Sequence, residues 1–247
     1  MSDININPLA IKIINLNKDY YLGKHNFLGV QTTIHSNKEI KKIQAIKNIN
    51  LEINKRDRVG LLGHNGSGKS TLLKIISNIT TPTSGEILVN GKICSILQGR
   101  VAFHPELTGL ENIYLVGALH GMSSGQIDKK IDNIIEFSEL KEFINTPIKR
   151  YSDGMSIKLA FSTLSHLDGD ILILDEILAT VDGFFREKVI KRILRKIDEE
   201  YLTLIFVSHQ IENIKDVCKK IVILERGEVK FAGGLDDGIK IYNNSLT

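Results

Sequence analysis

The sequence predicts an α/β fold in which a mostly parallel sheet is covered by helices on both faces. The apolar runs Ile171–Leu174 and Thr203–Val207 are typical of short strands that are buried on both sides. Each run is followed by apolar residues at helical spacing, first Ile190, Ile193, Leu194 and Ile197 and then Ile211, Ile214, Val217 and Cys218. Strands that alternate with helices in this way favour parallel pairing.

The N-terminal part predicts an antiparallel β subdomain. Ile11–Leu16 is a short candidate strand. In Ile46–Ile53 apolar residues alternate with polar ones, as in a half-buried strand. A polar insertion at about Leu22–Lys42 lies between them and shows no clear period, so we expect a loop or a small irregular flap.

Two hairpins are predicted from turn residues. Glu86–Val89 and Lys92–Leu97 flank Asn90-Gly91, a common hairpin turn. Ile221–Leu224 and Glu228–Phe231 flank Arg226-Gly227 and predict a closing hairpin.

The middle of the chain predicts an inserted helical subdomain at about 105–150. Ile127, Ile131, Ile134 and Ile135 fall on one helix face, and Ser123 or Ser124 could cap that helix. The 247 residues then form one domain, in which 1–104 and 151–247 supply the β subdomain and the core.

Composition excludes several classes of protein. The 32 basic residues sit among 29 acidic ones and form no block, so we expect no nucleic-acid partner. Cys94 and Cys218 lie too far apart to suggest a metal site or a disulfide framework, which fits a reducing cytosol. No signal peptide and no membrane-spanning run is present, so any role at a membrane requires another chain to hold this one there.

One stretch predicts a nucleotide-binding site. Gly63–Ser70 matches the P-loop pattern between an apolar strand, Val59–Leu62, and a helix, Thr71–Ile76. Glycines let backbone N–H groups close around a polyphosphate, and the helix N-terminus favours anions. Lys69 is expected on the β- and γ-phosphates and Ser70 on Mg²⁺. The predicted ATP contacts in this stretch are Gly63, His64, Asn65, Gly66, Ser67, Gly68, Lys69, Ser70 and Thr71.

Further polar residues follow the two buried strands. Asp175 is expected to hold Mg²⁺ and Glu176 to act as the general base, although two solvated acids could also end a strand. His209 could contact the γ-phosphate, or be structural. Tyr151–Met155, with Ser and Gly at a helix start, is an anion-binding arrangement or an ordinary turn and cap.

These motifs, taken in order, resemble the nucleotide-binding subunit of ABC transporters. The resemblance covers almost the whole chain and implies two copies that clamp two ATP molecules head to tail. It implies that Tyr151–Met155 is the signature loop, whose Ser152 and Gly154 bind the ATP held by the opposite copy, and that Asp182 is the D-loop residue and also binds ATP. Gln98 would help to hold Mg²⁺ and link the nucleotide to a membrane partner. Tyr20 would stack on adenine, with Tyr21 or a plain strand-edge tyrosine as alternatives.

Finer features resemble exporters of O-antigen and capsular polysaccharide. These features are Phe103–Ile113, Arg150–Met155 and the polar insertion. We therefore expect an ATPase that powers polysaccharide export through a separate integral membrane permease, placed peripherally on the cytoplasmic face of the inner membrane. We also expect the chain to lack the extra carbohydrate-binding domain that some O-antigen exporters append.

Some residues depart from the family pattern, and three alternatives stay open. Asp153 replaces a small residue in the signature loop, Gln98–Val101 replaces a Gly-rich run, and Ala179–Asp182 keeps only its Asp. The alternatives are teichoic acid or another lipid-linked substrate, a soluble ABC assembly factor, and a GTPase switch. The last rests on Asn54-Lys55-Arg56-Asp57, which precedes the P-loop instead of following it and is interpreted as a polar turn.

Overall fold

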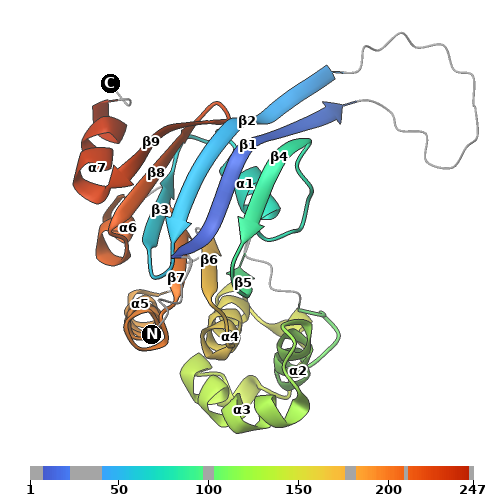
Figure 1. Cartoon of the computed structure of the whole chain (residues 1–247). Coiled ribbons are helices and arrows are strands. Elements are labelled where there is room, and N and C mark those ends of the chain that lie inside the picture. Colours follow the sequence, from blue (N-terminus) through green and yellow to red (C-terminus); the bar gives the residue numbers. More distant parts are fainter. Residues whose placement is uncertain (1–7, 23–40, 97–102, 176–181, 209–210, 245–247) are drawn as a thin grey trace, which may run out of the picture.

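The computed structural model describes residues 8–22, 41–96, 103–175, 182–208 and 211–244. Two sheets lie one over the other, with helices on the far side of the larger one (Figure 1). The smaller sheet has the order β2-β1-β4 and is antiparallel; its strands are β1 (Leu9–Leu22), β2 (Lys41–Asn54) and β4 (Ser84–Val89). It supplies the N-terminal β subdomain that the sequence predicts.

The larger sheet has the order β5-β6-β7-β3-β8-β9. Its strands are β3 (Arg58–Leu62), β5 (Ile93–Ile96), β6 (Ile171–Asp175), β7 (Thr203–Val207), β8 (Lys220–Glu225) and β9 (Glu228–Gly234). Pairing is parallel from β5 to β8, and only β9 is antiparallel to its neighbour. The predicted mostly parallel sheet and the closing β8–β9 hairpin are both confirmed.

Alternate side chains of the central strands enter two separate cores. On β6, Ile171 and Ile173 pack under the smaller sheet, whereas Leu172 and Leu174 pack against helices. Strand residues point to opposite faces in turn, so a strand covered on both sides must be apolar throughout. This two-sided burial explains why the strand runs were recognisable from sequence.

The helices complete the two layers. They are α1 (Lys69–Ile76), α2 (Gly109–Leu119), α3 (Ser124–Ser138), α4 (Asp153–His166), α5 (Gly183–Glu200), α6 (Ile211–Val217) and α7 (Leu235–Asn244), with 3₁₀ turns at Lys141–Phe143 and Ile148–Arg150. Helix α3 carries the predicted isoleucine face, and its cap is Ser123, paired with Gln126 in a capping box. No helix among the described residues is long and apolar enough to cross a bilayer.

The predicted hairpin around Asn90-Gly91 is wrong. Strand β4 pairs with β1 in the smaller sheet, whereas β5 pairs with β6 in the larger one. The Asn90 backbone N–H donates to Ala10 O at 2.8 Å, and the Lys92 N–H donates to an Asp170 carboxylate oxygen at 2.7 Å. These bonds on opposite sides of the turn carry the chain from one sheet to the other.

A buried asparagine organises the start of the helical segment. Asn112 is fully buried, and its amide group donates to the carbonyl oxygens of His104, Leu107 and Thr108. Its side-chain oxygen accepts from the His104 N–H at 2.7 Å. Because buried polar groups must be satisfied, this one side chain fixes the loop that leads into α2.

Stability at high pH is expected to depend on Cys218. Burial raises the pKa of this thiol to about 12, against an opposing effect of Arg58. The unfolded chain releases the proton near the ordinary value of 9.0. The resulting stabilisation is complete below pH 9 and is lost as the pH rises toward 12.

We expect the difference in unfolding free energy between the native chain and Cys218→Ala to shrink above pH 9. The slope would be at most about 1.4 kcal/mol per pH unit. Urea unfolding of both chains at intervals from pH 8 to pH 11.5 measures it, and titrations shared by the two chains cancel in the difference. A difference that stays constant over this range would contradict the assignment.

Candidate nucleotide site

The loop between β3 and α1 is a cradle of backbone groups. Gly63, Gly66 and Gly68 have φ values of 149°, 81° and 107°, which side chains other than hydrogen rarely tolerate. A Cβ on Gly63 would lie 2.3 Å from Leu224 O, and one on Gly68 would lie 2.7 Å from Ala45 O. The glycines therefore allow the loop to pack closely against its surroundings as well as to turn.

The turn between β8 and β9 supports this cradle from behind. Gly227 donates its N–H to Ser67 O at 2.9 Å and accepts from the Lys47 N–H at 2.8 Å. On another side, the His64 ring stacks on Tyr242 of α7, with ring centroids 6.1 Å apart. The loop conformation is thus held by segments that follow it by more than 150 residues.

Lys69 begins α1 and is folded over the cradle. Its side chain is buried, and the ammonium group donates to Gly63 O at 2.5 Å and to His64 O at 3.1 Å. These bonds hold a positive charge beside the backbone N–H groups of the loop. The arrangement is suited to a polyphosphate, which could take up the same donors.

Three observations show that the cradle fits an anion. The N-cap of α1 is Gly68, no side chain caps this helix, and its first turn holds no acidic residue. The hydroxyl of Ser67 is buried and has no hydrogen-bond partner among the described residues. A positive helix end without an acidic residue and an unpartnered hydroxyl together favour the binding of phosphate oxygens.

A cavity of about 380 Å³ opens between the loop and the smaller sheet. It is lined by Tyr20, Ile43, Gln44, Ala45, Asn65, Gly66, Gly68, Lys69, Ser70 and Thr71. Gly63, His64 and Ser67 lie in the loop outside this lining. The structure places Tyr20, and not Tyr21, in the lining, with 37% of Tyr20 exposed and Lys18 Nζ 5.2 Å from its ring centroid.

Sequence reasoning missed the β2 side of this cavity. Ile43 is paired with Tyr20 across the strands, and Gln44 and Ala45 follow it toward the cradle. Once Tyr20 was singled out, a register between the two strands could have found these residues. That register is interrupted by several irregularities in β1, which no alternation in the sequence reveals.

The ends of three strands align beside the cradle. Leu61 of β3 is paired with Val207 of β7, and Val207 is paired with Asp175 of β6. Asp175 therefore stands at the carboxyl edge of the sheet at the level of the P-loop, as expected. Ser208, which follows β7, is buried near Asn213. Glu176, His209 and Gln98 lie outside the described residues.

The magnesium ligands expected from sequence are only partly placed. Ser70 is exposed in the first turn of α1, so its hydroxyl is accessible to an ion held beside the phosphates. Among the described residues, no group of three His, Cys, Asp or Glu side chains could hold a metal by itself.

Ser152 caps α4, and the signature loop at the start of this helix has free space around it. Its hydroxyl accepts from the Met155 N–H at 3.2 Å, and a Cβ on Gly154 would meet only the Ser152 hydroxyl, 3.9 Å away. Asp153 is exposed to solvent. None of these residues lines the P-loop cavity of the same chain. The structure thus does not bring the two motifs together within one copy.

Asp182 caps α5 and joins an ionic network that sequence reasoning missed. Its carboxylate accepts from the Phe185 N–H at 2.9 Å and pairs with Lys158 of α4 at 2.9 Å. These two partners, the backbone bond first, hold the pKa of Asp182 below its ordinary value. Lys158 also pairs with Glu139 at the end of α3, and Lys188 of α5 pairs with Glu139 at 3.1 Å.

Lys158 therefore ties three helices together. Burial opposes its charge, but hydrogen bonds to Asp182 and Glu139 outweigh that effect and raise its pKa. A lone lysine in a helix gives no sequence signal for such a role. Only the fold brings both carboxylates to it.

We expect Lys158→Met to lower the free energy of unfolding by about 0.5–2 kcal/mol, because it removes two ion pairs whose carboxylates are partly exposed to solvent. The pKa of Asp182, followed by NMR, is expected to rise toward its ordinary value. Lys191→Met is the matched control, since Lys191 is 71% exposed in an i,i+4 pair, and it is expected to cost under about 0.5 kcal/mol. Equal effects of the two substitutions would contradict the network.

Comparison with known proteins decides the family. A family model described as ABC transporter matches residues 46–179. An O-antigen export system ATP-binding protein of Klebsiella pneumoniae is 37% identical over 96% of this chain and 98% of its own length. This chain belongs to the ABC transporter family. It is an ATP-binding and ATP-hydrolysing subunit, as the sequence predicts.

Other relatives and structures agree with this membership. A teichoic acids export ATP-binding protein of Listeria innocua is 37% identical over 95% of this chain and 69% of its own length. The dimeric structure of the ATP-binding cassette MJ0796 with ADP and Pi matches with a TM-score of 0.76 at 26% identity, covering 91% of this chain and 98% of that one. An ATP-binding subunit of another ABC transporter matches in fold, with a TM-score of 0.77 at 20% identity over 95% and 93% of the two chains.

Proposed function

We propose that this ABC ATPase powers the export of a polysaccharide of the O-antigen or capsule type across the inner membrane. The observation that carries the proposal is the 37% identity to an O-antigen export ATP-binding protein over nearly the full length of both chains. A teichoic acid exporter is the second candidate, because the Listeria innocua relative is equally identical. The first is favoured because the match extends over 98% of the first relative and 69% of the second.

Each predicted site residue has a role in the proposed reaction. The loop amides and Lys69 bind the β- and γ-phosphates, and Tyr20 stacks on the adenine. Ser70, Asp175 and Gln98 would hold Mg²⁺, which supplies neutralisation of phosphate charge when bound. Glu176 takes a proton from the attacking water, and His209 contacts the γ-phosphate. Positioning and charge stabilisation then account for catalysis.

Two copies of the chain are needed in this proposal. In one copy, Ser152 and Gly154 lie on an open helix end that does not line the cavity at Lys69. A head-to-tail dimer would place that helix end against the ATP of the other copy. The dimeric ATP-binding cassette MJ0796 supports such an assembly. Asp182, held by Lys158 on the signature helix, would move with that helix when the dimer opens and closes.

We further propose that the dimer works on the cytoplasmic face of the inner membrane, attached to an integral permease that carries the polysaccharide. A motion that starts at the nucleotide would reach this partner through Gln98 and the helical segment at 105–150. A soluble assembly factor is the competing class and would have no such partner.

A complementation experiment tests the proposed substrate. Cells that lack this chain receive either the native gene or Lys69→Ala, and both surface polysaccharide and intracellular lipid-linked polymer are measured. The proposal expects surface polymer with the native chain, and intracellular accumulation of lipid-linked polymer with Lys69→Ala. Normal surface polymer in the cells without this chain would contradict the proposal.

Purification of the tagged native chain from detergent-solubilised membranes tests the membrane partner and is expected to co-purify a polytopic membrane protein.

A further inference from the structure

A second cleft lies at the opposite end of the sheet from the P-loop. It has a volume of about 340 Å³ and is lined by Arg56, Asp57, Arg58, Ile197, Asp198, Lys219 and Lys220. Strands β3 and β8 begin there, whereas the P-loop follows the other end of β3. A ligand in this cleft would therefore leave the nucleotide cavity free.

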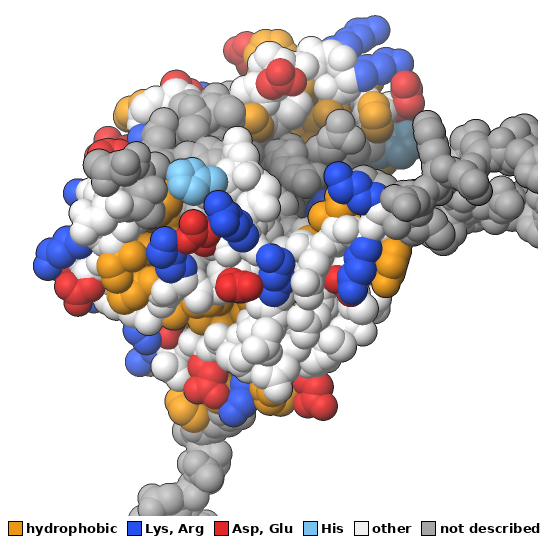
Figure 2. All heavy atoms as spheres, turned by 90° about the horizontal axis from the view of Figure 1, so that it is seen from above, with side chains coloured by type: hydrophobic (Ala, Val, Ile, Leu, Met, Phe, Trp, Pro, Cys, Tyr) orange, Lys and Arg blue, Asp and Glu red, His pale blue; other side chains and the backbone are white. Residues whose placement is uncertain are grey.

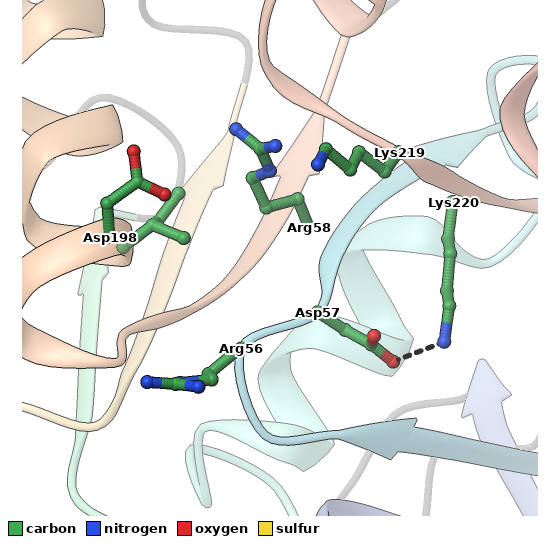
Figure 3. Close-up of a pocket in the computed structure, with 7 residues that line it drawn as sticks. Arg56, Asp57, Arg58, Asp198, Lys219 and Lys220 are labelled. Atoms are coloured by element: carbon green, nitrogen blue, oxygen red, sulfur yellow. Dashed lines mark hydrogen bonds and ion pairs between the residues drawn. The ribbon is translucent and has the colours of Figure 1, made fainter.

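The cations of this cleft outnumber their carboxylate partners. Asp57 pairs with Lys220 at 2.9 Å, as Figure 3 shows. Within the described part of the chain, Arg56, Arg58 and Lys219 form no ion pair. In Figure 3 the side chains of Arg58 and Lys219 point toward one another, and the Lys219 N–H is bonded to Arg58 O at 2.9 Å. Two like charges directed at one space repel each other, and an anion between them would relieve that repulsion.

Arg56 is held ready for a planar contact. Its guanidinium lies over the ring of Tyr201, with the carbon 3.5 Å from the ring centroid. Its backbone is left-handed, at a φ of 68°, and its N–H is held by the Thr203 hydroxyl at 3.1 Å. An arginine fixed in this way loses little further freedom when it binds, and its fork matches phosphate oxygens.

Asp198 defines the opposite wall. It extends from α5 toward the same space as Arg58 and makes no ion pair among the described residues (Figure 3). A carboxylate here repels a ligand that is anionic all over, but it accepts hydrogen bonds from hydroxyl groups. The volume of the cleft suits a small molecule and not a polymer.

We propose that this cleft binds a small, soluble phosphate ester that carries hydroxyl groups. Its phosphate lies against Arg58 and Lys219, with Arg56 at the side, and its hydroxyl groups donate to Asp198. Strand β3 runs from this cleft to the P-loop. A ligand bound in the cleft would therefore contact the first residues of the strand that leads into the cradle.

The charge pattern of this cleft differs from that of one other face of the molecule. On the face shown in Figure 2, basic and acidic side chains are interspersed. The cleft, in contrast, collects four basic side chains and two acidic ones around one hollow. A solvated surface lysine needs no partner, but a half-buried arginine that faces a lysine gains from one.

Amide NMR shifts of the full chain with glucose 1-phosphate test the proposal at low ionic strength. We expect saturable shifts at residues 55–58 and 219–220, separate from the P-loop signals that Mg-ATP moves. The double substitution Arg58→Gln with Lys219→Gln is expected to weaken the binding at least about tenfold. Its P-loop signals are expected to respond to Mg-ATP as before, which shows that the variant is folded. Lys191→Gln is the matched control on an exposed lysine and is expected to bind like the native chain.

The opposite wall has its own test. Asp198→Asn is expected to bind inorganic phosphate more tightly, because a repelling charge is removed, and to lose its preference for glucose 1-phosphate over inorganic phosphate. The proposal is overturned if glucose 1-phosphate causes no shifts at the cleft, or if the double variant binds it unchanged. Binding only to vesicles that contain phosphatidic acid would also overturn it, since the ligand would then be a membrane surface.

Discussion

A Glu176→Gln chain is expected to bind ATP normally and to hydrolyse it about 100- to 10,000-fold more slowly than the native chain. The glutamine keeps the size and hydrogen-bonding capacity of the side chain but cannot take a proton from water, and general-base catalysis is worth this range. With hydrolysis blocked, the proposed head-to-tail dimer would have no route to open. Gel filtration with Mg-ATP is therefore expected to show a dimer for the variant, and monomers when nucleotide is left out.

The control for this experiment is Glu187→Gln. Glu187 is 64% exposed and, among the described residues, forms an ion pair only with Lys191, so its substitution is expected to leave hydrolysis unchanged. Steady-state phosphate release measures the rate of ATP hydrolysis by the native chain, Glu176→Gln and Glu187→Gln. Unaltered turnover in Glu176→Gln would remove Glu176 from the catalytic role. If the native chain is itself inactive, Asp153→Gly tests whether the signature-loop carboxylate weakens the site. The same comparison is then made in a reconstituted complex with the proposed permease.

Gly63→Ala is expected to cost about 3–5 kcal/mol of unfolding free energy and to abolish ATP binding. The new Cβ would lie 2.3 Å from Leu224 O and 2.6 Å from the Ser67 hydroxyl. The first of these is a backbone atom near the end of β8, so it cannot move aside as a flexible side chain would. Relief requires a shift of the loop or of the strand, and such distortions produce the largest effects of single substitutions.

Gly66→Ala separates conformational strain from this clash. Gly66 also has positive φ, 81°, but a Cβ there would meet nothing within 4 Å. It is expected to cost about 1–2 kcal/mol, the penalty of a left-handed residue with a side chain. Thermal unfolding and binding of a fluorescent ATP analogue compare the two variants. Similar losses in both would mean that the contact of Gly63 with Leu224 is unimportant.

The sequence predicted those parts of the fold in which a local pattern and its environment agree. Ile171–Leu174 is apolar throughout because both of its faces are covered, and the glycines of 63–68 are dictated by positive φ and close packing. Asn90-Gly91 misled because a turn dipeptide carries no information about which strands its flanks will join. The bonds of that turn to Ala10 and to Asp170 depend on residues about 80 positions away in each direction.

The candidate site was predictable to a different degree in each part. The P-loop is contiguous, so its spacing alone specifies the cradle. The β2 wall at Ile43–Ala45 and the Lys158 network arise only when distant elements meet, and single residues of those types have many ordinary uses. Contacts between two copies of the chain cannot be predicted from the pattern of one sequence alone. Here they were expected only because the sequence resembles a family.

The stacking of Tyr242 on His64 provides a position for a fluorescent probe of nucleotide binding. The chain has no tryptophan, so Tyr242→Trp would introduce its only indole directly against the nucleotide loop. The emission of that indole would respond to its contact with the His64 ring. Nucleotide arrival and departure could then be followed in a stopped-flow instrument on the unlabelled protein, before any permease is identified.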